Sequence, residues 1–212
     1  MLKSKDIIDI FPFEEEELIK DIFKESSFTS LDENTQLIKE GEYIKSFPLI
    51  VSGCIKVSRL DLDGDELLLY YLNKGEVCTM ALTCCTTNIK SNIQAIAIED
   101  SKILKIPVKF IDEWMYKYPS WKKFIMSSYR FKFEELLNTI DSIAFMKMDQ
   151  RLVLYFKNLY RSTHKKEYIG SHKQIAYDLN TSREVISRLL KKLEKNQKIN
   201  IYRNKIDFSS LL

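Results

Sequence analysis

Residues Ser171–Glu194 hold two short amphipathic patterns back to back, and no other stretch constrains the fold as strongly. The apolar positions recur at helical spacing in each half: Ile175, Ala176 and Leu179, then Ile186, Leu189, Leu190 and Leu193. Between the halves, Asn180-Thr181-Ser182 can end one helix, and Thr181 or Ser182 can cap the next. Helix, tight turn and helix is the arrangement that places a second helix in the major groove of DNA.

The polar face of the second helix carries Arg183, Glu184, Ser187 and Arg188, which project together from its first turns. Arginine can pair bidentately with guanine O6 and N7, and glutamate can accept a hydrogen bond from cytosine N4, so this face can read base edges. The alternative is a solvated helix in which Glu184 and Arg188 form an i, i+4 ion pair.

Charge is distributed unevenly along the chain. Residues 146–212 contain 15 Lys and Arg against 6 Asp and Glu, whereas residues 1–145 contain 18 against 24. An acidic front and a basic back third indicate a sensing domain joined to a nucleic-acid-binding domain. A basic tail can also meet a membrane, but the apolar positions of this segment are committed to a core.

The beginning of the chain, Met1 to Asp6, is too charged and too short in its apolar part for a secretory signal. No apolar run approaches the roughly 20 residues that cross a bilayer. We therefore expect a cytoplasmic protein without a membrane partner, whose four cysteines are thiols rather than disulfides.

From about Phe28 to Pro107 the pattern is that of β-strands. Four glycines punctuate it: Gly41, Gly53, Gly64 and Gly75. Short β-rich pieces lie between and beyond them: Ile44–Val51, Cys54–Leu60, Glu66–Leu72, Ile93–Ile98 and Ser101–Ile106. Asp61 to Asp65 reads as a hairpin turn. Such regular spacing predicts a jelly-roll-like antiparallel β-domain.

Helical patterns flank this β-domain. A short helical lead-in is expected at residues 7–26, and another short helix at Val108–Lys117. A long helix then carries an apolar stripe at heptad-like spacing: Met126, Tyr129, Phe133, Leu136, Ile140 and Ile143. Other faces carry Phe124, Phe131 and Leu137, so one face can dock on the β-domain while the stripe meets a second copy. We expect a parallel homodimer.

After a hinge at Lys147-Met148-Asp149, the basic domain begins with a helix at Arg151–Leu159. Tyr168-Ile169-Gly170 reads as a short strand or turn, and Lys198–Phe208 as a hairpin "wing" with Arg203 at its tip. The predicted fold is α+β: an N-terminal antiparallel β-roll (residues 1–117), a long dimerisation helix (118–145) and a C-terminal winged helix-turn-helix (146–212).

In this order of elements the chain resembles the Crp/Fnr family of bacterial transcription regulators over nearly its whole length. The closest match runs from Ile175-Ala176 through Ser182 to Leu190, then Leu193-Glu194 and Ile199; Gly41-Glu42 and Gly75-Glu76 match the β-roll more loosely. The resemblance implies a dimer that binds a two-fold DNA site, acts with RNA polymerase, and responds to a signal in the β-roll.

Arg183, Glu184 and Arg188 fall on the three base-reading positions of this family, which implies a TGTGA/TCACA-like palindrome. The wider set of DNA contacts expected from the pattern and the resemblance is Ser182, Arg183, Glu184, Ser187, Arg188, His172, Lys173 and Arg203.

The β-roll sequence differs from the signal-binding patterns of known family members, and these differences disfavour some candidate signals. Cyclic-nucleotide binders of this family grip the phosphate with an Arg-Ser or Arg-Thr pair, and an anion needs such a cation or a helix N-terminus. Gly75–Gln94 contains no arginine and only one cation, Lys90, which disfavours cyclic AMP and cyclic GMP. The first cysteine is Cys54, so the N-terminal cysteine cluster of iron–sulfur members is missing as well.

The expected effector pocket comprises Gly75, Glu76, Cys78, Thr79, Met80, Cys84 and Cys85. Its three cysteines can be thiol sensors or ligands of a metal or haem iron, or small buried hydrophobes, and both interpretations stay open. Both histidines lie in the basic domain, so a haem in the β-roll needs Cys, Met80, Tyr or an external ligand. Some family members sense nitric oxide through haem, so our first hypothesis for the signal is haem or nitrosative stress. The sequence does not identify the cofactor or a metal.

Other classes of function are less favoured. No Ser/His/Asp spacing, metal-binding His pair or Walker loop is present, so we do not expect an enzyme. A second alternative is a small-molecule-binding module that does not bind DNA, but the Arg183-Glu184-Arg188 face argues against it. A third is a small-molecule-binding module that binds DNA whether or not its ligand is present.

Overall fold

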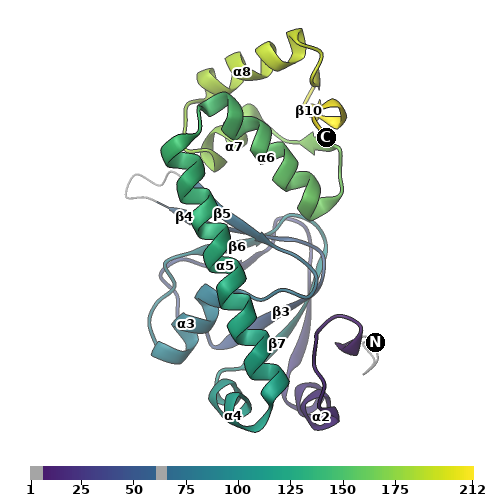
Figure 1. Ribbon diagram of the computed structural model, residues 1–212, viewed down its shortest axis with the longest axis vertical. Coiled ribbons are helices and arrows are strands. Elements are labelled where there is room, and N and C mark those ends of the chain that lie inside the picture. The colour runs from purple at the N-terminus through teal and green to yellow at the C-terminus, as the bar shows by residue number, and fades with distance from the viewer. Residues whose placement is uncertain (1–6, 61–65) are drawn as a thin grey trace. The chain divides into compact units, whose positions relative to one another are not determined.

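The computed structural model describes residues 7–60 and 66–212, and these form two compact units (Figure 1). The first unit extends to Val57 and resumes over Tyr70–Leu136, and the second holds Ser58–Leu69 together with Leu137–Leu212. The predicted hairpin turn at Asp61–Asp65 lies outside the described residues.

Two antiparallel sheets build the β-region, as the spacing of short strands predicts. One has the order β1-β7-β3 and the other β2-β6-β4-β5. The strands are β1 (Ser27–Leu31), β2 (Gln36–Ile38), β3 (Ser46–Ser52), β4 (Ile55–Leu60), β5 (Glu66–Leu72), β6 (Gln94–Ala97) and β7 (Ser101–Pro107). The central strand β7 pairs with β1 on one side and β3 on the other, so the first sheet joins distant parts of the chain.

The helices of this region are α2 (Glu16–Glu25), α3 (Thr79–Thr87), α4 (Lys109–Lys117) and the long α5 (Pro119–Phe145). The predicted lead-in, short helix and long helix are therefore present, while α3 was not expected. Pro119 opens α5, where a missing N–H costs nothing and the fixed φ suits a helix.

Aromatic side chains fill the core of the first unit. Trp114 of α4 and Trp121 of α5 meet edge to face at 5.3 Å between ring centroids, and Phe13 meets Phe124 in the same way at 5.2 Å. Because Trp121 and Phe124 of α5 are both buried, the first turns of this helix pack into the core of the unit.

Gly53, between β3 and β4, shows why a glycine is required at a turn of this roll. Its φ is +87°, and a Cβ there would approach the Cα of Ser101 to 2.6 Å. Any larger residue would be strained in its backbone and would also push strand β7 away.

The second unit contains α6 (Met148–Thr163), β8 (Glu167–Ile169), α7 (His172–Asp178), α8 (Arg183–Lys195), β9 (Asn200–Tyr202), β10 (Lys205–Asp207) and the 3₁₀ turn Ser209–Leu211. The three strands form a sheet in the order β8-β10-β9, so the predicted wing hairpin gains a third strand. Phe156 stacks on Phe208 at 4.9 Å between ring centroids, and both rings are fully buried, which links α6 to the end of the chain. No helix among residues 7–60 and 66–212 is both long enough and apolar enough to span a membrane.

Candidate DNA interface and effector region

Helices α7 and α8 are joined by a turn whose backbone is fixed residue by residue. Asn180 adopts a left-handed φ of 48°, which ends α7, and the N–H of Thr181 donates to Ala176 O at 2.9 Å. Ser182 then caps α8, since its Oγ accepts from the N–H of Val185 at 3.3 Å. The break therefore works as predicted, with Ser182 rather than Thr181 as the cap.

The predicted base-reading side chains come together on the first two turns of α8. Arg183, Glu184 and Arg188 are exposed, whereas the apolar side of the helix is buried through Ile186, Leu190 and Leu193. Ser187 is half-buried, and its Oγ shares a hydrogen bond of 2.9 Å with Nδ1 of His172. His172 thus braces α8 from the first turn of α7.

Two charge states on this face follow from local contacts. Hydrogen bonds from its own backbone N–H and from Ser182 lower the pKa of Glu184, so its carboxylate stays ionised and able to accept from a base amino group. Burial, with a smaller contribution from Arg183, lowers the pKa of His172. At neutral pH the imidazole is therefore mainly uncharged.

The remaining predicted DNA contacts lie at the edges of the same unit. Lys173 is exposed on α7, with its ammonium 5.1 Å from the ring centroid of Tyr177. Arg203 is exposed at the tip of the β9-β10 hairpin, where Asn204 takes a left-handed φ of 59° that the tight turn needs. Both positions can supply cations to phosphates beside a helix that reads bases.

Buried polar contacts hold α7 against α6. Tyr155 donates to Asp178 Oδ2 at 2.8 Å, and Arg151 Nη2 donates to Leu179 O at 2.9 Å. The reading helix therefore rests on a helix that is itself hydrogen-bonded to α6, which gives the exposed face a defined orientation within its unit.

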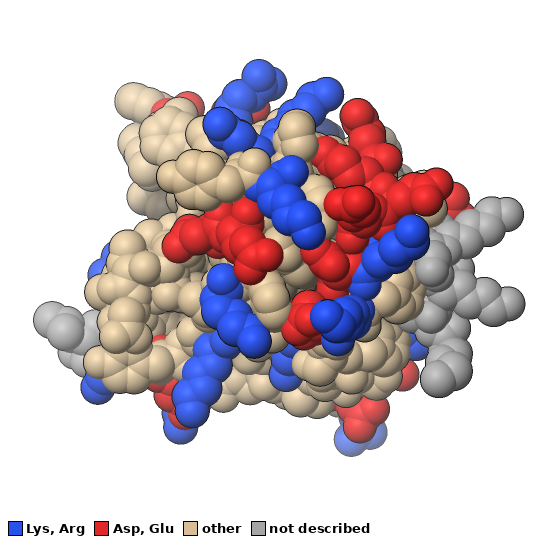
Figure 2. Space-filling view, turned by 90° about the horizontal axis from the view of Figure 1, so that it is seen from below, with Lys and Arg blue, Asp and Glu red and all other residues tan. Residues whose placement is uncertain are grey.

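The surface elsewhere carries both signs of charge. Figure 2 shows a face on which acidic and basic side chains are interleaved. Ion pairs such as Lys117–Asp21 at 3.1 Å, between α4 and α2, contribute to such mixing. A mixed surface offers little net attraction to a polyanion, so the concentration of cations in residues 146–212 distinguishes that segment.

In the predicted effector region, the cysteines are part of the interior. Cys78 caps α3, with Sγ accepting from the N–H of Ala81 at 3.4 Å, and Cys84 and Cys85 lie within that helix. All four cysteines of the chain are buried thiols that form no disulfide. Burial raises the pKa of Cys78 to about 11 and that of Cys85 to about 12, and it also raises the pKa of Cys84.

These thiols are therefore protonated and weakly nucleophilic at neutral pH. Among the described residues, no group of three or more His, Cys, Asp and Glu side chains is placed to hold a metal ion. The geometry supports the interpretation of these cysteines as small buried hydrophobes.

Gly75 and Glu76, by contrast, form a well-anchored turn beside α5. Gly75 has a φ of +83°, its N–H donates to Ile50 O at 2.9 Å, and the N–H of Ile50 donates to Glu76 O at 3.0 Å. Glu76 Oε2 accepts from Lys132 Nζ at 2.8 Å. These two members of the predicted pocket line a cavity against α5, whereas Cys78, Thr79, Met80, Cys84 and Cys85 do not.

Lys132 is a buried charged residue beside this cavity that the sequence did not reveal. Its ammonium donates to Tyr71 O at 3.1 Å, Glu76 Oε2 at 2.8 Å and Glu135 Oε2 at 2.6 Å, and only 3% of its side chain is exposed. It sits amid exposed charged neighbours on α5, so nothing in the local pattern marks it as buried.

The apolar stripe of α5 is largely open in the single chain. Met126, Phe133, Ile140 and Ile143 are exposed, while Tyr129 and Leu136 are half-buried. Tyr129 also shares a hydrogen bond of 3.0 Å with Thr83 of α3. An apolar face of this kind is typical of a surface that another chain covers.

Known proteins with a similar sequence or structure share this order of domains. Residues 28–118 match the family described as Cyclic nucleotide-binding domain. A chain from Eubacterium rectale, assigned to the Crp/Fnr family of transcriptional regulators, aligns with a TM-score of 0.81 at 20% identity, covering 92% of this chain and 90% of its own. The chain has the Crp/Fnr fold.

Two further relatives, one matched by structure and one by sequence, are also similar over most of their length. The c-di-GMP responsive global regulator CLP of Xanthomonas campestris aligns with a TM-score of 0.79 at 16% identity, covering 92% of this chain and 99% of its own. By sequence, a global nitrogen regulator of Nostoc is 22% identical over 185 residues, which is 84% of this chain and 82% of the relative. The predicted α+β fold class is confirmed by these matches.

Proposed function

We propose that this Crp/Fnr-fold chain is a sequence-specific DNA-binding transcription regulator and not an enzyme. The observation that carries the proposal is the exposed Arg183-Glu184-Arg188 face on a helix that Ser182 caps and α7 supports. The names of the relatives agree, since they are global regulators or Crp/Fnr transcriptional regulators. As a regulator of this type, it would meet RNA polymerase at the promoter.

The proposed DNA target is a TGTGA/TCACA-like palindrome, because two arginines and one ionised glutamate can pair with two guanines and a cytosine in each half-site. Selection of binding sites from randomised duplexes should enrich that sequence with the wild-type protein. Glu184→Ala should relax the preference at one base position, since an alanine accepts no hydrogen bond from cytosine. An unaltered preference in this variant would show that the residue assignments are wrong.

We also propose a homodimer that buries the stripe of α5. Two copies related by a two-fold axis place each stripe residue near its own counterpart, so Ile140→Glu would bring two carboxylates together in an apolar contact. Sedimentation velocity should show this variant as a monomer at a protein concentration at which the wild type is a dimer.

Phe145→Glu is the matched control for this experiment. Phe145 is 82% exposed on the same helix but lies off the stripe, so its replacement should leave the dimer intact. If both variants remained dimeric, the stripe would not be the interface.

The signal that controls DNA binding is not a reactive thiol in this proposal. Burial of Cys78 and Cys85 keeps both thiols protonated, which disfavours the thiolate that a redox sensor uses as its nucleophile. A ligand that binds beside α5 is the alternative that the structure favours, and its chemistry is considered next.

A further inference from the structure

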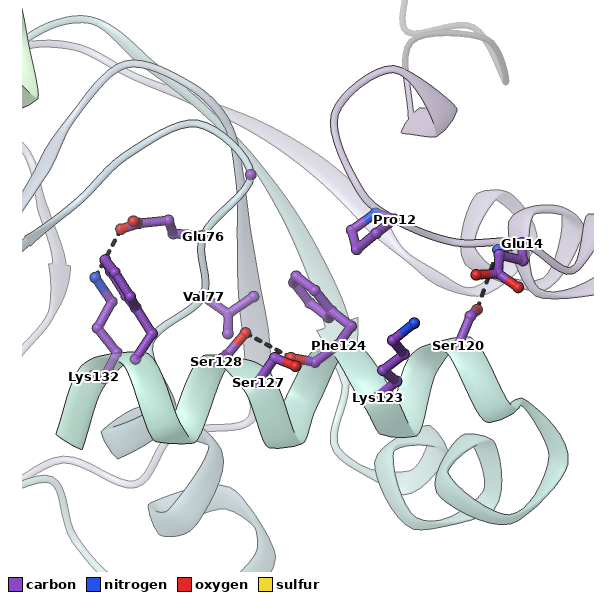
Figure 3. A pocket seen from close by; sticks show the side chains of 12 residues that line it. Pro12, Glu14, Glu76, Val77, Ser120, Lys123, Phe124, Ser127, Ser128 and Lys132 are labelled. Carbon is purple, nitrogen blue, oxygen red and sulfur yellow. Dashed lines mark hydrogen bonds and ion pairs between the residues drawn. The ribbon is translucent and has the colours of Figure 1, made fainter. Parts of the chain in front are cut away.

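A cavity of about 330 Å³ lies along α5 in the first unit, on the side of the Gly75–Glu76 turn (Figure 3). It is lined by Pro12, Glu14, Gly75, Glu76, Val77, Ser120, Lys123, Phe124, Ser127, Ser128, Phe131 and Lys132. Figure 3 shows Glu14, Ser120 and Lys123 toward one end and the Glu76–Lys132 ion pair at the other, with Val77 and Phe124 between them.

The two ends of the cavity differ in whether their charged side chains are already paired. Lys132 is bound by both Glu76 and Glu135, so its ammonium group is already paired and is not offered to a ligand. Glu14 and Lys123 are exposed, and among residues 7–60 and 66–212 neither side chain has an ion-pair partner. One end therefore presents a carboxylate and an ammonium that are both available.

Between the ends the wall is apolar. Phe124 is 7% exposed and Val77 is 1% exposed, while Phe131 remains 49% exposed beside the cavity. Lys123 and Lys132 are nine residues apart, so the trough runs for about 13 Å along the helix. This length accommodates one apolar side chain, including an aromatic one, in addition to a charged head group.

The cavity stays accessible when α5 pairs with a second copy through its stripe. Phe131 lines the cavity and Phe133 belongs to the stripe, and two residues correspond to a rotation of about 200° around a helix. The cavity and the stripe thus occupy roughly opposite sides of α5.

We propose that this cavity binds a free α-amino acid with an apolar side chain. Glu14 receives the ammonium group of the ligand, Lys123 receives its carboxylate, and Phe124 and Val77 contact its side chain. A zwitterion satisfies both free charges at once, whereas a plain anion or cation would leave one of them opposite a like charge. The proposal concerns the first unit and does not depend on the proposed DNA binding.

The experiment compares L-phenylalanine with two analogues that each lack one charge, 3-phenylpropanoate and phenethylamine, by isothermal titration calorimetry on the full chain. L-phenylalanine should bind, and each analogue should bind at least about tenfold more weakly because one charge pair is lost. L-leucine and L-tryptophan, tested in parallel, report how long a side chain the trough accepts. Binding of either analogue as tightly as the amino acid would overturn the proposal.

Variants locate the site. Glu14→Gln and Lys123→Ala should each weaken L-phenylalanine binding at least about tenfold. Glu16→Gln and Lys122→Ala are the matched controls, because both residues are exposed charges near the test positions. Each control should change the affinity for L-phenylalanine less than about twofold. The charge-exchanged double variant, Glu14→Lys with Lys123→Glu, should regain part of the affinity that the Lys123→Glu single variant loses. Unchanged melting temperatures would show that each variant is folded. Equal effects of the test and control variants, or no binding of L-phenylalanine at about 10 mM, would overturn the proposal.

Discussion

Replacing Arg188 by alanine should lower the affinity for a TGTGA-containing palindrome by roughly thirtyfold to ten-thousandfold. Each bidentate arginine–guanine pair contributes roughly 1–3 kcal/mol of discrimination, and a dimer loses one in each half-site. Arg188 is exposed on the capped α8, so its removal leaves the packing of the second unit intact. Fluorescence anisotropy with the palindrome and with a scrambled duplex measures the change.

Arg161→Ala is the control for net charge. Arg161 is exposed near the end of α6 and is not among the predicted DNA contacts, so its removal should affect both duplexes slightly and equally. If Arg188→Ala weakened binding to the palindrome and the scrambled duplex by the same factor, Arg188 would contact phosphates rather than bases.

Lys132→Met should destabilise the first unit by about 3–5 kcal/mol, which is the range measured when one partner of a buried ion pair is removed. The ammonium of Lys132 links α5 to Tyr71 O and to the Glu76 turn, and methionine leaves the carboxylates of Glu76 and Glu135 facing each other without a cation. Thermal unfolding followed by circular dichroism should show a decrease in Tm of about 10 °C.

The loss of stability caused by Lys132→Met should become smaller as the pH falls. Burial already raises the pKa of Glu135 in the folded protein, so the folded state holds this proton more tightly than the unfolded state does. That contribution is fully present below the pKa of an unfolded glutamate, about 4.3, and is lost as the pH rises through the folded value. Without Lys132 the pKa of Glu135 rises further, so Lys132→Met should differ less from the wild type at pH 5 than at pH 7.

Lys122→Met serves as the control for this measurement, because Lys122 is exposed on the same helix. It should change Tm little. Adding Glu135→Gln to Lys132→Met should recover part of the loss, since it removes one of the two unpaired carboxylates. A Tm of Lys132→Met equal to that of Lys122→Met would mean that the buried ion pair does not stabilise the protein.

The helix-turn-helix could be predicted because its signals are local. The capping residue Ser182 and the helically spaced Ile186, Leu190 and Leu193 lie within a few residues of one another. The structure shows both the cap and the helix. The long helix α5 was predictable for the same reason, as its bounds are marked by Pro119 at one end and by the loss of pattern after Phe145.

The elements that were missed lack such local signals. Helix α3, Thr79–Thr87, is rich in threonine and cysteine and has buried residues on several sides, so no amphipathic period marks it. Strand β1, Ser27–Leu31, buries only Leu31, and it is specified by its pairing with β7 about 75 residues later. Lys132 is buried only because the distant Glu76 turn meets α5, which a local reading cannot foresee.

The four buried cysteines make this protein convenient for site-directed labelling. Buried thiols are shielded from maleimides in the folded state, so a single cysteine introduced on the surface would carry nearly all of the dye. Lys173→Cys on α7 and Arg203→Cys at the hairpin tip offer exposed attachment points. Energy transfer from each to an end-labelled duplex would then report which edge of the second unit approaches the DNA backbone.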